Sequence, residues 1–304
     1  MKNLTCAICG QKTPFEILFP ASFKRKQINK GIFSARRTPD RCHCRIVRCR
    51  KCGLIFSNPF LREKAIHRLY QESELTYGPE IGSLKKTYGN YLKKIINFVP
   101  EKNNLLEIGC GNGFFLKEAL KLGFKNVWGV EPSVDAVNKA DSEIKPFIKL
   151  NNFQAKLFKN NFFDVICFFQ TLDHIINPNL FLNDCFKILK RQGIIFCIVH
   201  NSNSFLTKIL GEKTPIFDIE HTYLYDKSTL RKIFEKNNFE VIKVINTANE
   251  YSLRYWFSLL PLGIAFKKGV EKVISLFSLE KISLRIKAGN IVIVAKKAAL
   301  FDRN

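Results

Sequence analysis

Three glycines within five residues are the first feature of this sequence that could support chemistry. Gly109, Gly111 and Gly113 read G-x-G-x-G, whereas the dinucleotide-binding fingerprint requires G-x-G-x-x-G. The third glycine of that fingerprint would fall at Phe114, a bulky residue where helix and strand must pack closely. No Lys-Ser or Lys-Thr follows the glycines, so the cluster is not a P-loop. The spacing therefore indicates another kind of nucleotide-binding loop.

Two acidic residues accompany the glycines. Glu107 lies two residues before Gly109, and Glu131 lies eighteen residues after Gly113. A carboxylate at residue 107 would repel a pyrophosphate but would attract an ammonium group. A carboxylate at the end of the next strand can accept hydrogen bonds from two ribose hydroxyls. A ligand with a cationic amino-acid end and a ribose satisfies both acids, and S-adenosylmethionine is such a ligand.

A strand, a tight turn and a helix must position these groups. "NLLEIG" (104–109) is a short apolar run that ends in glycine, as expected of a buried parallel strand. "FFLKEALKLG" (114–123) has apolar residues at helical spacing and a glycine as its stop signal. "NVWGVEPS" (126–133) is expected to form the second strand. The glycines should therefore lie at the first strand-to-helix turn of a doubly wound sheet, where ligands bind at strand carboxyl ends.

Four cysteines near the N-terminus form two copies of the motif C-x-x-C-G. The motifs are "CAICG" and "CRKCG", and their cysteines are Cys6, Cys9, Cys49 and Cys52. Two such pairs can hold one tetrahedral Zn²⁺, and the glycine after each pair lets backbone amides turn toward the thiolates. Cys42, His43 and Cys44 could substitute as ligands, although we expect them to be bystanders on a strand. A site closed by four thiolates has no open position, so this zinc should be structural.

Three of the five histidines follow the expected fourth and fifth strands, where an acceptor would bind. If the acceptor must lose a proton, an imidazole is the simplest base. His221, next to Glu220 in "PIFDIEHTYLY", is the first candidate, and His200, at the end of a strand, is the second. A different role for His221 is a hydrogen bond that orders its segment over the cofactor. His174 is expected to have a structural role.

The segment "EIGCGNG" resembles the first motif of the class I S-adenosylmethionine-dependent methyltransferases, E/D-x-G-x-G-x-G, at every fixed position. The resemblance extends from about Leu105 to Lys296, and "GNIVIVAKK" looks like the family's hairpin strand. It implies an α/β fold with a doubly wound, mostly parallel sheet of seven strands. It also implies that Gln170 faces the methionine side of the cofactor. Asn152, or Asn151, would contact the adenine, with Phe153 either against the ring or in the core.

The cysteine motifs narrow this resemblance. A zinc ribbon in front of such a domain is similar to bacterial methyltransferases of surface polysaccharides and secondary metabolites, including sugar C-methyltransferases. The resemblance implies a small-molecule acceptor such as a sugar, a nucleotide-sugar or a precursor of a surface polysaccharide or secondary metabolite, and the basic insertion described below would also suit a lipid-linked acceptor. The alternative is an RNA methyltransferase with a zinc-binding recognition module. The formal net charge of +23 favours that alternative, whereas the lack of an N/D-P-P-F/Y motif argues against it.

The chain of 304 residues is expected to contain two parts, a zinc-ribbon module (1–60) and a methyltransferase domain (61–304). A basic amphipathic insertion is expected at about 251–288, with apolar residues Val270, Val273, Ile274 and Phe277 on one helical stripe. It could form a cap, a dimer face or a peripheral membrane contact. We expect a cytoplasmic protein, because the N-terminus lacks an apolar signal region and the cysteine pattern suits a reducing compartment.

Overall fold

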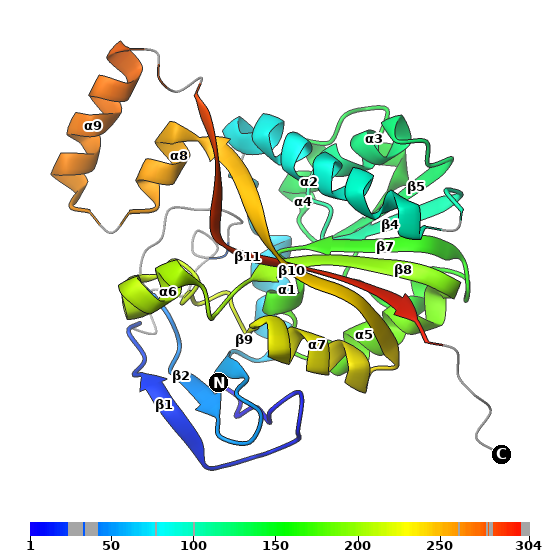
Figure 1. The fold of residues 1–304 in the computed structure, drawn as a ribbon, viewed down its shortest axis with the longest axis horizontal. Helices are drawn as coiled ribbons and strands as arrows, with labels where there is room; N and C mark the ends of the chain where they lie inside the picture. Colours follow the sequence, from blue (N-terminus) through cyan, green and yellow to red (C-terminus); the bar gives the residue numbers. More distant parts are fainter. Residues whose placement is uncertain are drawn as a thin grey trace.

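A twisted sheet of seven strands forms the centre of the molecule (Figure 1). The computed structural model describes residues 1–23, 33, 42–76, 78–99, 101–260, 262–277, 279 and 282–298. The strand order is β10-β11-β8-β7-β4-β5-β6, and β11 alone runs antiparallel to its neighbours. The strands are β4 (Asn104–Ile108), β5 (Asn126–Glu131), β6 (Ile148–Leu150), β7 (Phe163–Phe169), β8 (Leu189–His200), β10 (Phe239–Ser252) and β11 (Ser283–Lys297). The expected α/β fold with a mostly parallel sheet is confirmed.

Helices cover both faces of this sheet because its inner strands are apolar on both sides; every residue of β7, for example, is buried. On one face lie α2 (Ile81–Ile95) and α3 (Phe114–Lys121), and on the other lie α5 (Pro178–Ile188) and α7 (Lys227–Lys236) (Figure 1). The remaining helices are α1 (Glu63–Gln71), α4 (Val134–Asn138), α6 (Phe205–Leu210), α8 (Leu253–Ser258) and α9 (Ile264–Leu276). Among the described residues, no helix is long and apolar enough to cross a membrane.

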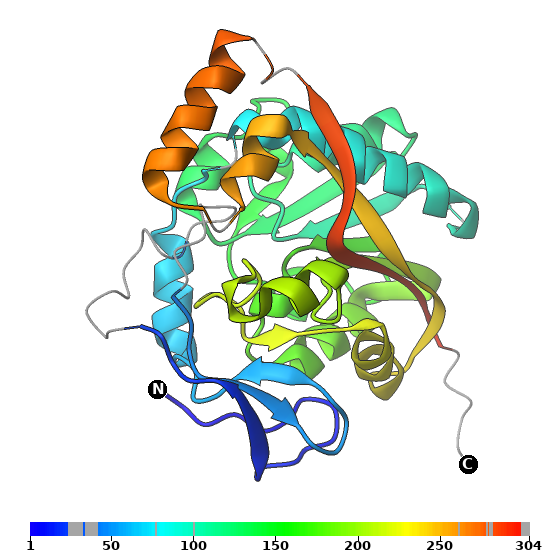
Figure 2. The ribbon, with the colours of Figure 1, turned by 60° about the vertical axis from the view of Figure 1, so that its left-hand side comes forward.

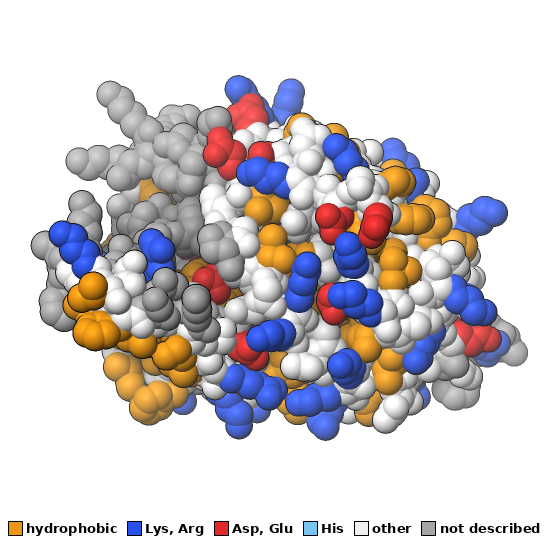
Figure 3. Space-filling model, turned by 90° about the horizontal axis from the view of Figure 1, so that it is seen from above, with side chains coloured by type: hydrophobic (Ala, Val, Ile, Leu, Met, Phe, Trp, Pro, Cys, Tyr) orange, Lys and Arg blue, Asp and Glu red, His pale blue; other side chains and the backbone are white. Residues whose placement is uncertain are grey.

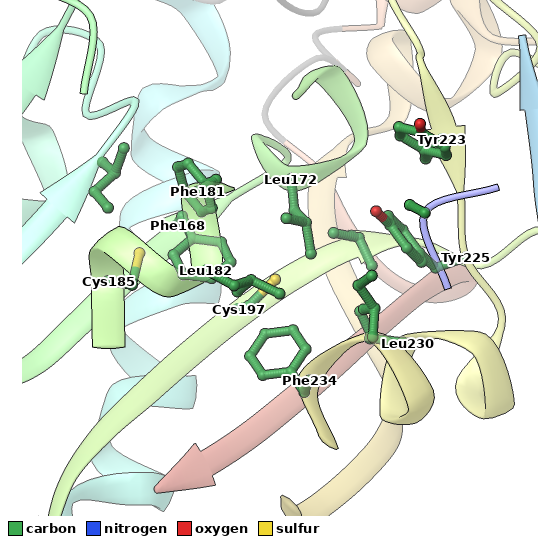
Figure 4. Close-up of a cluster of buried hydrophobic side chains, with 14 of the residues drawn as sticks. Phe168, Leu172, Phe181, Leu182, Cys185, Cys197, Tyr223, Tyr225, Leu230 and Phe234 are labelled. Atoms are coloured by element: carbon green, nitrogen blue, oxygen red, sulfur yellow. The ribbon is translucent and has the colours of Figure 1, made fainter. Parts of the chain in front are cut away.

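Two large apolar cores lie among the described residues of these layers, and a smaller cluster with Ile55 and Leu224 lies at the N-terminal sheet. One contains residues of α2, α3 and the glycine loop, such as Leu84, Phe115 and Cys110. The other contains residues of α5 and α7 together with cysteines of the N-terminal segment. Figure 4 shows part of the second core, with Phe168 and Phe181 near Cys185 on one side and Tyr223 and Tyr225 toward the N-terminal segment on the other.

A second, smaller sheet is built around the N-terminal segment. Its four strands, in the order β1-β2-β3-β9, are β1 (Phe15–Phe19), β2 (Ile46–Cys49), β3 (Ile55–Ser57) and β9 (Tyr223–Leu224). The last of these strands comes from the second half of the chain. The domain boundary at residue 60 stays a prediction. The N-terminal module and the larger domain both contribute strands to the small sheet and side chains to one apolar core.

The expected insertion is shorter than 251–288. Tyr251 and Ser252 still pair with Leu284 and Ser283, so β10 and β11 extend beyond the main sheet as a two-stranded ribbon. Among the described residues between the two strands, the helices are α8 and α9 (Figure 1). The proposed helical stripe is also incomplete, because Ile274 is buried whereas Val273 and Phe277 are 51% and 66% exposed.

Candidate active site

A cavity of about 840 Å³ opens at the carboxyl ends of the parallel strands. It is lined by the glycine loop, by the ends of β5, β7 and β8, and by residues of α1, α2, α6 and α8. Figure 2 looks toward this edge of the sheet, with α1, α6 and α8 around it. The volume lies in the upper part of the range for small-molecule sites, so the cavity can hold a nucleoside cofactor and a second small molecule.

The three glycines form the turn between β4 and α3. Each has a positive φ, which L-residues with a side chain rarely adopt. A Cβ at Gly109 would lie 2.6 Å from Oγ1 of Thr171, and a Cβ at Gly113 would lie 2.6 Å from Cγ2 of Ile144. The first and third glycines are therefore required by close packing, and the loop backbone can approach a ligand.

Glu131 shapes the loop from the neighbouring strand. Its carboxylate accepts hydrogen bonds from the backbone amides of Gly111 (2.8 Å) and Ser133 (2.9 Å). Burial raises the pKa of Glu131, and the two amides partly offset this effect. Glu131 lies at the end of β5, as the sequence predicted, and it lines the cavity.

Glu107 lines the cavity and is deeply buried, with 2% of its surface exposed. Its Oε2 atom has no hydrogen-bond partner among the described residues. Burial raises the pKa of Glu107 well above its usual range, and the negative charge of Glu131 adds to this effect. An unpartnered buried carboxylate beside a cavity calls for a cationic partner, which the ammonium group of S-adenosylmethionine would supply. The part of the cavity formed by the glycine loop, Glu107 and Glu131 therefore fits that cofactor, and we call it the cofactor half.

Two further residues that were predicted to bind the cofactor also line the cavity. Gln170 follows β7 in a left-handed conformation (φ 51°), and its Oε1 is buried without a hydrogen-bond partner among the described residues. Asn152 lies beyond the end of β6. Phe153 packs edge-to-face on Phe181 at 5.3 Å between ring centroids, so it belongs at least in part to the core.

Three histidines surround a buried aspartate at the other half of the cavity. Nδ1 of His200 lies 2.7 Å from Oδ2 of Asp173, whose side chain is only 1% exposed. Nε2 of His221 lies 3.9 Å from the same oxygen, and Nε2 of His174 lies 3.8 Å from Oδ1. Burial alone would raise the pKa of Asp173, but the hydrogen bond from His200 and the electrostatic influence of the three neighbouring histidines hold it below its usual range.

The two predicted base candidates differ in their surroundings. The ring of His221 is 8% exposed, and its Nδ1 contacts the carbonyl of Ile216 at 2.8 Å. Burial lowers the pKa of His221 well below its usual value, with a smaller effect from His174 and His200. His200, in contrast, is 26% exposed and is oriented by an ionised carboxylate. Glu220 is buried and lines the cavity, and its backbone amide bonds to Asp218.

Two residues of this cluster were not predicted as site residues from the sequence. Asp173 stands directly before His174, and an acid a few residues after an apolar strand was the signal that could have identified it. Tyr70, from α1, places its hydroxyl 2.7 Å from Nδ1 of His174. The pKa of Tyr70 is raised by burial and by Glu220, Asp173 and Asp218. No local pattern marked Tyr70, because it reaches the cavity from a helix 104 residues earlier in the chain.

The four predicted metal-ligand cysteines come together in the N-terminal module. All four sulfurs lie within 4.8 Å of one another, with 3.3 Å between Cys6 and Cys52 and 3.5 Å between Cys9 and Cys49. Each C-x-x-C-G motif (residues 6–10 and 49–53) forms a tight turn that we call a knuckle. In both knuckles the backbone amide of the glycine donates a hydrogen bond to the carbonyl of the first cysteine. This donor set fits a tetrahedral Zn²⁺. His43 is outside the group, since its ring contacts the carbonyl of Cys44 and the carboxylate of Glu212.

Comparison with known proteins identifies similar domains. The family described as a methyltransferase domain matches residues 84–244. A mitochondrial ubiquinone biosynthesis O-methyltransferase from Dictyostelium discoideum is 26% identical over 171 residues, which cover 49% of this chain and 53% of that protein. The ubiquinone biosynthesis O-methyltransferase of Pelagibacter ubique is 29% identical over 157 residues, which cover 48% of this chain and 65% of that protein.

The matched segment thus spans between 45% and 65% of the length of these curated relatives. Among solved structures, a SAM-dependent methyltransferase from Archaeoglobus fulgidus is similar, with a TM-score of 0.47 and 20% identity. That similarity covers 70% of this chain and 94% of the other.

Proposed function

The chain belongs to the family of methyltransferase domains, with S-adenosylmethionine as the cofactor, and we propose that it methylates a hydroxyl group of a small-molecule acceptor. One observation carries this proposal. The unpartnered carboxylate of Glu107 and the pair of Asp173 and His200 line or border the same cavity, so a cofactor half and a proton-accepting half lie next to each other.

The residues of the cofactor half would bind and orient. S-adenosylmethionine supplies, when bound, a methyl group on a positively charged sulfur. We propose that Glu107 holds the ammonium group, that the backbone of Gly109, Gly111 and Gly113 lies against the amino-acid part, and that Glu131 accepts hydrogen bonds from the ribose. Asn152 and Gln170 would contact the adenine and the methionine side. Transfer to an oxygen then depends mainly on the in-line position of the acceptor.

The residues of the acceptor half would remove the proton. Because Asp173 is ionised, Nδ1 of His200 would donate to it. Nε2 would then be left to accept the hydroxyl proton as the methyl group passes from the sulfonium sulfur to the hydroxyl oxygen, with S-adenosylhomocysteine as the leaving group. This is the arrangement by which a buried acid fixes the tautomer of a catalytic histidine. We therefore propose His200 as the base. His221, the first candidate from the sequence, is less suited because burial lowers its pKa, and together with Glu220 it would border the acceptor.

The charges of the cavity favour a neutral or cationic acceptor. The described lining residues include seven carboxylates, Glu63, Glu74, Glu107, Glu131, Asp184, Asp218 and Glu220. They include two lysines, Lys156 and Lys187, and no arginine. A phosphodiester chain would be repelled here, and on the face drawn in Figure 3 the basic side chains are spread among acidic and apolar ones. The alternative of an RNA methyltransferase is therefore not favoured.

The acceptor class remains a proposal. The curated relatives are named for O-methylation in ubiquinone biosynthesis and not for sugars, which supports a hydroxyl acceptor over the predicted sugar or nucleotide-sugar. Exposed apolar residues of α6, Phe205 and Ile209, lie near the cavity lining residues Leu206 and Leu210. They support the further proposal that a lipid-linked acceptor, or a peripheral membrane contact, belongs to this site. A cytoplasmic location stays a prediction.

The experiment uses the full chain in two steps. Calorimetry should first detect binding of S-adenosylmethionine. Formation of S-adenosylhomocysteine is then measured with three probes: a dihydroxybenzoate, a nucleotide-activated deoxysugar and bulk ribosomal RNA. We expect turnover of a hydroxyl acceptor that is lost in His200→Ala while cofactor binding is kept. Absence of cofactor binding would refute the proposal, and preferential methylation of RNA would support the alternative.

A further inference from the structure

The N-terminal module is connected to the acceptor half of the cavity through one strand pair. β3 pairs antiparallel with β9, so that Ile55 lies opposite Leu224 and Phe56 opposite Tyr223. β9 begins two residues after His221. The segment that carries His221 therefore enters the small sheet directly after it leaves the cavity.

Ser57 makes the contacts at the point where these two strands meet. Its Oγ donates to the carbonyl of His221 at 2.8 Å, and its backbone amide donates to the carbonyl of Thr222 at 2.9 Å. Both Ser57 and Thr222 are buried, with 1% and 0% exposure. On the opposite side, the amide of Thr222 donates to the carbonyl of Asp173 at 2.8 Å. The backbone of residues 221–222 is thus held between the N-terminal module and the segment that follows β7.

The two cysteine knuckles are attached to different parts of the molecule. The carbonyl of Ala7, in the first knuckle, accepts hydrogen bonds from Asn179 of α5 (2.9 Å) and Lys236 of α7 (2.7 Å). The second knuckle ends at Gly53 and leads within two residues into β3, which carries Ser57. A metal held by both knuckles would therefore tie β3, and with it the His221 segment, to the helices of the larger domain.

We infer that Ser57 positions His221, and that the four-cysteine module, with its metal, thereby sets the geometry of the acceptor half of the cavity but not of the cofactor half. The inference rests on the proposed function only in that it calls this part of the cavity the acceptor half; the contacts themselves do not depend on it. It gives the module a role beyond its own folding, because removal of the metal would release the strand that fixes a residue of the site.

The separation from the cofactor half follows from the two cores. Cys6, Cys49 and Tyr223 belong to the core that also contains residues of α5 and α7. Cys110 and Phe114, in the glycine loop and at the start of α3, belong to the core on the opposite face of the sheet. The module makes its direct contacts with the His221 segment and with α5 and α7. We therefore expect its loosening to leave in place the glycine loop, which packs at Gly113 against Ile144 and Ile148 of the other core.

Selective ¹⁵N-histidine labelling can test this inference, because the chain has only five histidines. The His221 resonance is assigned with His221→Gln. In the native protein this ring should stay neutral through the usual titration range of histidine, since burial lowers its pKa. In Ser57→Ala we expect the ring to titrate nearer its usual value and amide exchange in residues 218–224 to accelerate about tenfold or more. Ser57→Thr, which keeps the hydroxyl, should restore both properties.

Arg48→Ala is the matched control, since it removes a half-exposed ion pair with Glu16 in the same module. Zinc content and affinity for S-adenosylmethionine, measured by elemental analysis and calorimetry, should stay within about threefold in all three variants. Unchanged His221 titration and exchange in folded Ser57→Ala would overturn the inference, as would an equal effect of Arg48→Ala.

If Ser57→Ala fails to fold, zinc is removed from the native protein with a chelator. Amide exchange in residues 218–224 should then rise while cofactor affinity is kept, and loss of both together would contradict the separation. Failure of the native protein to bind S-adenosylmethionine would refute the proposed function, but it would leave the readouts at His221 valid.

Discussion

The carboxylate of Asp173 lies 2.7 Å from the imidazole Nδ1 of His200, although Asp173 follows β7 by four residues and His200 is the last residue of β8. β7 and β8 are parallel neighbours, so the segments at their carboxyl ends meet at the same edge. Asp173 is buried and stays ionised because three histidines compensate its desolvation. The pair therefore provides a fixed tautomer of His200 at the cavity.

Replacement of His200 should separate chemistry from cofactor binding. We expect His200→Ala to lower kcat by a factor of about 100–10,000, the range for loss of a general base, with unchanged affinity for S-adenosylmethionine. Asp173→Asn should lower kcat as well, because the amide cannot stabilise the protonated ring. Asp141→Asn, which alters an exposed ion pair with Lys117, serves as the control. Turnover of His200→Ala within a few fold of native would refute His200 as the base.

Glu107 should make cofactor binding depend on pH. Its pKa is raised in the free protein, so the carboxylate holds a proton at pH values where an exposed glutamate is ionised. A cationic ligand favours the ionised form, so binding should release protons and affinity should fall as pH decreases through the raised pKa. Calorimetry in buffers of different ionisation enthalpy measures this release. Glu107→Gln should abolish it and weaken binding about 10–100-fold. Equal proton release in both proteins would contradict the assignment.

The same group should affect the stability of the protein without cofactor. Because the folded pKa of Glu107 is raised, its stabilising contribution is fully present below the unfolded pKa and is lost as pH rises through the folded pKa. Thermal unfolding of the free protein should therefore show a decline at higher pH that Glu107→Gln lacks. A decline of the same size in both proteins would exclude Glu107 as its source.

Gly113 should not accept a side chain. A Cβ there would lie 2.6 Å from Cγ2 of Ile144 and 2.9 Å from Cδ1 of Ile148, at a φ of 72°. We expect Gly113→Ala to lower the free energy of unfolding by about 1–3 kcal/mol from overpacking, measured by urea denaturation. Gly82→Ala is the control, because nothing lies within 4 Å of its Cβ and alanine favours the helix α2. Equal stability of the two variants would show that the turn can relax.

The four-cysteine group should bind about one Zn²⁺ per chain, held by Cys6, Cys9, Cys49 and Cys52. Elemental analysis of the purified protein measures the content. Cys9→Ser should lose the metal and destabilise the module, whereas Cys42→Ala should keep it, because Cys42 is outside the group. Metal-free native protein with these cysteines in disulfides would contradict the assignment.

Local sequence patterns determined the cofactor half of the site. The glycines, Glu107 and Glu131 occupy one strand-turn-helix unit and the following strand, and their spacing alone fixes which end of the sheet they reach. The two C-x-x-C-G motifs likewise specify a thiolate site, since each pair is already close within its own turn. The seven-stranded fold followed from the same alternation of apolar runs and helical periods, together with the family resemblance of the glycine motif.

The acceptor half depended on the tertiary structure. Asp173, His200, His221, Tyr70 and Ser57 come from separate elements, and no short-range spacing relates them. Their contacts arise from the order of the strands and from the pairing of β3 with β9, which brings together Ser57 and His221, 164 residues apart in the chain. The protonation state of His221 also depends on the tertiary structure, because neighbours from distant segments of the chain bury the ring and so lower its pKa.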